Sequence, residues 1–169
     1  LKTIEEPPSF GIIFLLTENA GLLLETIRSR CIRLDMDKLP DEMIRRILVE
    51  KFRISEAEAE DFAAFADGNL GRAESLAEGG EGSRERSQMT EVLSEIENLN
   101  ALEIYKSASE VESGDRNVAL ECVRKWFRDV LFIKSGCPGK LYFPGRVRYL
   151  RQDAERMSYE NINAVIRIS

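Results

Sequence analysis

Residues 115–136 have the sequence DRNVALECVRKWFRDVLFIKSG, and this stretch decides the fold class. Its apolar residues recur every three or four positions, which is the spacing that places side chains on one face of an α-helix. That face contains Ala119, Cys122, Val123, Trp126, Phe127, Val130 and Leu131. Gly136 and the Cys137-Pro138-Gly139 sequence end the helix, because glycine and proline disfavour its continuation. The sequence therefore predicts a long helix with Trp126 and Phe127 in a core.

Helical patterns also occupy the chain from Pro40 onward, on both sides of this helix. Ser55 and Glu58 have the spacing of a capping box, which marks the start of a helix. The sequence GGEGS at residues 79–83 is typical of a hinge between two parts. We therefore predict two helical domains, residues 37–80 and residues 84–169, and we expect the second to be truncated.

The beginning of the chain has a different pattern. Residues 11–16, Gly-Ile-Ile-Phe-Leu-Leu, form a continuous apolar run, which is typical of a strand buried on both faces of a parallel sheet. The side chains of residues 31–34 alternate in character, as they do in a short strand. We predict that residues 1–36 are the tail of an α/β domain. Leu1 and the absence of a stop signal at Ser169 indicate a fragment of a longer protein.

The composition limits the classes of function. The net charge of -6 argues against nucleic-acid binding by bulk electrostatics, and the absence of histidine removes the usual general base. Cys31, Cys122 and Cys137 are too widely spaced for a zinc site or a disulfide framework, so we expect a reducing cytoplasm. No apolar stretch approaches the length of a membrane span.

Three segments, in order, carry a resemblance to a known family. The first combines LKTIEEPP at residues 1–8, the apolar run, and TIRSRC at residues 26–31; the second is DGNLGRA at residues 67–73. The third is WFRDVLFIKSG at residues 126–136. Together they resemble the AAA+ subunits of bacterial DNA polymerase III clamp loaders. The third segment is more similar to the delta-prime subunits than to the gamma/tau ATPase subunits.

This resemblance implies a mainly α fold in three parts. Residues 1–36 would be the C-terminal edge of the RecA-like AAA+ core, with one or two strands. Residues 37–80 would be the small helical lid domain, and residues 84–169 the helical collar through which subunits oligomerise. The missing N-terminal part would contain any phosphate loop and any zinc module of the family.

The resemblance also implies a role in a hetero-oligomer. The chain would be a non-catalytic subunit that assembles with gamma/tau ATPase subunits and the delta subunit. It would act indirectly on the sliding clamp and primer-template DNA. No cofactor is expected in this fragment, because ATP and Mg²⁺ would be bound by the neighbouring subunit.

Arg30 is the principal candidate site residue. By resemblance it would be an arginine finger, offered in trans to ATP on the adjacent subunit, with Ser29 and Cys31 fixing the shape of the turn. A planar guanidinium suits this role because it stays charged and donates paired hydrogen bonds to phosphate oxygens. The alternative is an ordinary surface ion pair.

Three further residues could sense nucleotide. Arg72 falls in the first turn of its predicted helix, where backbone N–H groups favour an anion; the alternative is a structural ion pair between lid and core. Thr17 is followed by Glu18 where ATPase subunits typically have a second threonine. A carboxylate there would repel a γ-phosphate, which favours a subunit that does not hydrolyse ATP.

Phe132 lies off the apolar face of its helix and is a candidate for an interface.

Two other functions stay open from the sequence. The chain could belong to an ATP-hydrolysing gamma/tau-type subunit or another AAA+ ATPase. It could also be an unrelated helical binding module, in which case residues 1–36 should not form the edge of a sheet. A Walker A loop is absent from these 169 residues.

Overall fold

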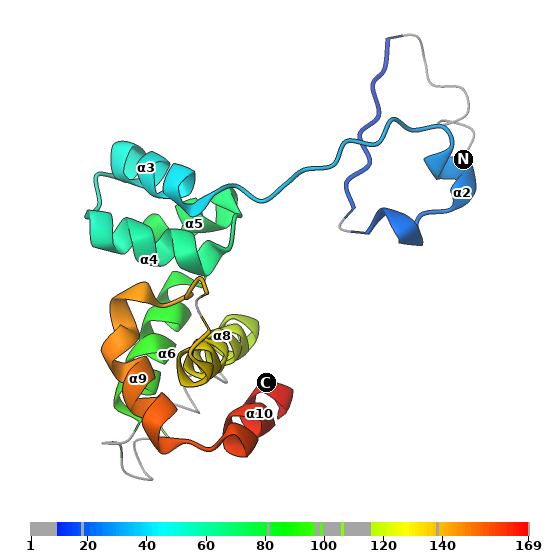
Figure 1. Ribbon diagram of the computed structural model, residues 1–169. Helices are drawn as coiled ribbons and strands as arrows, with labels where there is room; N and C mark the ends of the chain where they lie inside the picture. The colour runs from blue at the N-terminus through cyan, green and yellow to red at the C-terminus, as the bar shows by residue number, and fades with distance from the viewer. Residues whose placement is uncertain are drawn as a thin grey trace. The chain divides into compact units, whose positions relative to one another are not determined.

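The computed structural model describes residues 10–17, 19–80, 82–96, 99, 106, 116–137 and 139–168. The chain divides into two compact units, Leu1–Asp37 and Lys38–Ser169. Every regular element in the described residues is helical, which confirms the mainly α prediction (Figure 1). The assignment of the parts to AAA+ core, lid and collar stays a prediction.

The described residues of the N-terminal unit contain two short helical elements, η1 (Ala20–Leu22) and α2 (Glu25–Arg28). The side chain of Asn19 starts η1 by accepting a hydrogen bond from the backbone N–H of Gly21 at 2.9 Å. Ser29 closes α2, because its backbone N–H donates to the carbonyl of Glu25 at 2.9 Å.

The strands predicted at residues 11–16 and 31–34 are not formed in this structure. The described residues there have no regular secondary structure. Several of their apolar side chains are exposed, including Leu16 (97%) and Ile32 (90%). A strand needs a neighbouring strand to satisfy its backbone N–H and C=O groups. No such neighbour exists within the described part of this unit.

The second unit begins with three helices: α3 (Asp41–Phe52), α4 (Glu56–Ala66) and α5 (Leu70–Ala77). The predicted capping box is confirmed, since Ser55 and Glu58 exchange side-chain and backbone hydrogen bonds at the start of α4. Asp67 ends α4 in the left-handed conformation, and the side chain of Asn69 caps α5. The core of this α3–α5 group consists of Ile44, Leu48, Ala59, Ala63, Ala66 and Ala73.

The remaining elements form what we term the α6–α10 group. They are α6 (Ser83–Glu95), α8 (Arg116–Ser135), η2 (Pro144–Arg146), α9 (Val147–Arg156) and α10 (Tyr159–Ile168). Helix α8 is the predicted long helix, and it contacts α6, α9 and α10 (Figure 1). Its residues Trp126 and Phe127 are buried, as predicted. Phe65 of α4 and Leu76 of α5 belong to the same core cluster, so one core joins the two helix groups.

Two buried carboxylates hold the α6–α10 group together. Asp129 is fully buried on α8 and accepts hydrogen bonds from the backbone N–H groups of Tyr142 and Phe143, at 2.6 and 3.0 Å. Asp153 of α9 accepts a bond from the indole N–H of Trp126 at 2.8 Å. These bonds place the ring of Phe143 against that of Trp126, with centroids 5.4 Å apart. The loop after α8 is therefore anchored by polar contacts inside an apolar core.

Replacement of Asp129 tests this anchor. Burial raises the pKa of Asp129 despite the hydrogen bonds that it accepts, so its charge is only partly compensated. Asp129→Ala leaves two backbone donors without an acceptor and should lower the free energy of unfolding by about 3 kcal/mol. Asp129→Asn keeps one acceptor oxygen and removes the charge, so its loss should be less than about 1 kcal/mol.

Urea denaturation of the two variants is the measurement, with the exposed Glu155→Ala on α9 as a control. Equal losses for the alanine and asparagine variants would show that the charge, rather than the acceptor oxygen, stabilises the loop.

Candidate functional site

The turn after α2 presents Arg30. The backbone N–H of Arg30 donates to the carbonyl of Ile27 at 3.0 Å, which continues the helical turn past the end of α2. Its guanidinium Nη1 donates to the carbonyl of Thr26 at 2.7 Å. The hydroxyl of Ser29 donates to the same carbonyl at 3.3 Å. Arg30 is exposed, so these contacts orient the side chain without burying it.

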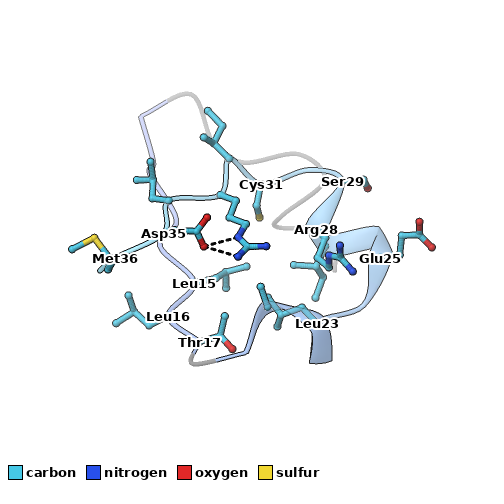
Figure 2. A pocket seen from close by; sticks show the side chains of 15 residues that line it. Leu15, Leu16, Thr17, Leu23, Glu25, Arg28, Ser29, Cys31, Asp35 and Met36 are labelled. Carbon is cyan, nitrogen blue, oxygen red and sulfur yellow. Dashed lines mark hydrogen bonds and ion pairs between the residues drawn. The ribbon is translucent and has the colours of Figure 1, made fainter. Parts of the chain in front are cut away.

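A pocket of about 650 Å³ lies beside this turn in the N-terminal unit (Figure 2). Thr17, Ser29 and Cys31 line it, whereas Arg30 does not. Arg33 and Asp35 form an ion pair on its wall, marked by the dashed lines in Figure 2, with a closest distance of 2.6 Å. Much of the lining is leucine, isoleucine and methionine. The structure therefore gathers three predicted site residues around a cavity of mixed character and leaves Arg30 outside it.

The two residues predicted to face a nucleotide have limited structural support. The hydroxyl oxygen of Thr17 accepts a hydrogen bond from the backbone N–H of Asn19 at 3.2 Å and so shapes the turn that follows. Glu18 lies outside the described residues. Cys31 is an exposed free thiol. The sensing role of Thr17 and Glu18 thus stays a prediction.

Arg72 forms an ion pair, but with a partner that the sequence did not indicate. Its guanidinium binds Glu121 of α8 through two hydrogen bonds: Nη1 donates to Oε1 at 2.8 Å, and Nη2 donates to Oε2. Lys125, one turn further along α8, contacts the same Oε1 at 2.7 Å. The predicted alternative was an ion pair between lid and core. The observed pair instead joins the α3–α5 group to the α6–α10 group.

An aromatic ring completes the surroundings of Arg72. The guanidinium carbon of Arg72 lies 4.9 Å from the centroid of the Phe65 ring, and Nζ of Lys125 lies 4.2 Å from it. Arg86 of α6 also packs on this ring, at 4.8 Å. Cations on aromatic faces are attracted by the negative face of the ring. Three cations therefore converge on Phe65, and Glu121 is the carboxylate that pairs with two of them.

Phe132 is half-buried on α8 and is covered by its own chain. The guanidinium carbon of Arg128 lies 4.1 Å from the ring centroid. A Cβ atom at Gly139 would lie 2.5 Å from ring carbons of Phe132, so a larger residue there would require the ring to shift. These contacts account for Phe132 within the unit, and its role at an interface stays a prediction.

Glu121, Lys125 and Asp129 were missed by the sequence analysis. The spacing of Glu121 and Lys125, four residues apart, is the known pattern of a helical ion pair and could have indicated that pair. Nothing in the sequence connects Arg72 to Glu121, which are 49 residues apart. That pairing follows from how the helix groups pack.

Two classes of site have no support in the described residues. Within those ranges, no group of histidine, cysteine, aspartate or glutamate residues could hold a metal ion. None of the helices in these ranges is long and apolar enough to cross a membrane.

The environment of Glu121 predicts how stability depends on pH. Burial would raise the pKa of Glu121, but hydrogen bonds from Arg72 and Lys125 outweigh burial and lower it. A carboxyl group whose pKa is lower in the folded state stabilises the fold above the pKa of the unfolded chain, about 4.3. This contribution is lost as the pH falls through the folded-state pKa.

Glu121→Gln should therefore lower the free energy of unfolding by about 1–3 kcal/mol at pH 7. The difference from the wild type should shrink below about pH 4. Denaturant unfolding at several pH values measures this, and a difference that is constant down to the lowest pH would contradict it.

Comparison with known proteins adds one match. Residues 1–40 match a protein-family model described as "DNA polymerase III, delta subunit". No curated protein matches the chain, and no solved structure does. The matched stretch contains α2, the Ser29-Arg30-Cys31 turn and all of the residues that line the pocket. This match supports a relationship between the chain and the clamp-loader subunits of DNA polymerase III.

Proposed function

We propose that this chain is part of a delta-prime-type subunit of a replicative clamp loader, which supplies Arg30 in trans to a neighbouring ATPase subunit. The observation that carries the proposal is the family match over residues 1–40, which includes the exposed turn at Arg30. The hydrogen bond from Arg30 to the carbonyl of Thr26 supports it, because a side chain that is oriented in advance loses less entropy when it engages a phosphate.

The chemistry of the proposed step is electrostatic. Charge on the γ-phosphate oxygens must be stabilised while the phosphoryl group leaves ADP, and a guanidinium supplied by another subunit does so without a proton transfer. ATP and Mg²⁺ would be bound by the neighbouring gamma/tau subunit, so this chain would hydrolyse no nucleotide by itself. Ser29 and Cys31 would hold the turn in shape.

The helical unit would serve assembly. Its α6–α10 group would pack with the corresponding domains of the gamma/tau and delta subunits, and Phe132 is a candidate contact. The assembled loader would act on the sliding clamp and on primer-template DNA. The ion pair of Arg72 supports the interpretation that this subunit does not sense nucleotide, because Glu121 binds the guanidinium.

The test is ATP hydrolysis by a loader reconstituted with the full-length parent chain. Arg30→Ala should reduce turnover at the site that receives the finger by about 10³-fold, while the complex stays assembled. The ATP turnover of the whole loader should then fall by the fraction that this single site contributes to it. Arg30→Lys should restore little, because an ammonium group does not reproduce the two parallel donors of a guanidinium.

Arg28→Ala is the matched control, since Arg28 is also an exposed arginine, two residues before Arg30, in the same matched stretch. Equal turnover in the Arg30→Ala and Arg28→Ala loaders would refute the finger. Loss of assembly in Arg30→Ala, detected by size-exclusion chromatography, would make Arg30 an interface residue instead. Hydrolysis by the isolated parent chain would favour a gamma/tau-type ATPase.

A further inference from the structure

Residues 67–72, which we term the α4–α5 turn, comprise the connection between the two helices and the first three residues of α5, and they contact three other parts of the helical unit. At its start, Asp67 pairs with Lys38 at 2.5 Å and with Lys140 at 3.6 Å. At its end, Arg72 pairs with Glu121 of α8. The turn therefore contacts the segment that leads into α3, the loop after α8, and α8 itself.

Gly68 brings the leading segment close to this turn. Its φ angle is +87°, and a Cβ atom there would lie 2.5 Å from Cβ of Lys38. Its carbonyl accepts a hydrogen bond from the backbone N–H of Leu39 at 3.1 Å. Both the backbone conformation and the close approach require glycine. Lys38 and Leu39 are thus fixed to the α4–α5 turn before α3 begins.

One carboxylate pairs with two of the three cations around Phe65. Arg72, Arg86 and Lys125 all pack on this ring, and Arg86 has no ion-pair partner among the described residues. Glu121 pairs with both Arg72 and Lys125. Without the charge of Glu121, Arg72 and Lys125 would lose the carboxylate that pairs with both of them, in a half-buried space where repulsion between cations is less screened than in water.

We propose that the turn at residues 67–72 couples the orientation of the α3–α5 group to that of the α6–α10 group, and that this coupling requires the carboxylate of Glu121. The shared apolar core around Phe65 brings the two groups together, and the Arg72–Glu121 pair fixes their relative orientation. This inference concerns the helical unit alone and does not rest on the proposed replication function.

Distance measurement between two spin labels tests the coupling in the full chain. Cysteines placed at the exposed positions Glu50 of α3 and Arg151 of α9 report on the two helix groups. The exposed Cys31 and Cys137 are replaced by serine. Cys122 can stay, because burial raises the pKa of its thiol to about 12 and keeps it protonated and unreactive.

The wild-type background should give one narrow distance distribution. Glu121→Gln and Arg72→Gln should each add a second population, and the double variant should add no more than either single change. Coupling between contacting residues commonly changes an equilibrium by about 2- to 150-fold, so we expect the population of the second state to rise about tenfold. Circular dichroism checks that helix content is unchanged.

Lys51→Gln is the matched control. It removes an ion pair of similar length, Lys51 to Glu74 at 2.8 Å, that joins α3 to α5 inside one helix group. Its distance distribution should stay narrow. Distributions that are equally narrow in all variants, or equally broad in the wild type, would overturn the proposal. If a variant unfolds, a KCl titration of the wild type gives the same test, because salt should broaden the distribution only if ion pairs fix the orientation.

Discussion

The burial of Phe65 is the constraint on which the helical unit depends. This side chain belongs to α4, yet it is fully buried in the core to which α6, α8, α9 and α10 contribute, where its ring lies 5.7 Å from that of Phe143. An aromatic side chain of this size contributes more buried apolar area to a core than an alanine side chain does. The two helix groups therefore share a core, and Arg72 and Lys125, which pack on the Phe65 ring, are held where they can pair with Glu121.

The success of the helix predictions and the failure of the strand predictions have one physical cause. A helix satisfies its backbone hydrogen bonds within its own residues, so the periodicity of residues 115–136 and the Ser55–Glu58 box were sufficient to locate α8 and α4. A strand is completed only by a neighbour. Residues 11–16 have the composition of a buried strand, but their side chains are largely exposed in the described N-terminal unit. Sequence alone gives the preference of such a segment and not its partner.

The site residues likewise divide into those that the sequence could predict and those that it could not. The aromatic core at Trp126 and the turn at Ser29-Arg30-Cys31 were predictable, because they depend on residues close together in the chain. The partners of Arg72 and Asp129 were not, because each interaction needs the packing of a distant element. Asp129 would ordinarily be assigned to the solvent face of a helix, yet it is buried beneath a loop that donates two backbone hydrogen bonds to it.

The environments of Arg30 and Arg72 differ in the exposure of the side chain and in its partners. Arg72 donates two hydrogen bonds to a carboxylate that Lys125 also contacts, so a phosphate would have to displace Glu121 and leave that carboxylate partly buried beside a negative charge. The cost of an unpaired, half-buried carboxylate opposes such an exchange. Arg30 lies on an exposed turn inside the stretch that matches the DNA polymerase III family. Of the two arginines, Arg30 is the exposed one, and Arg72 is engaged in contacts that join the two helix groups of its own unit.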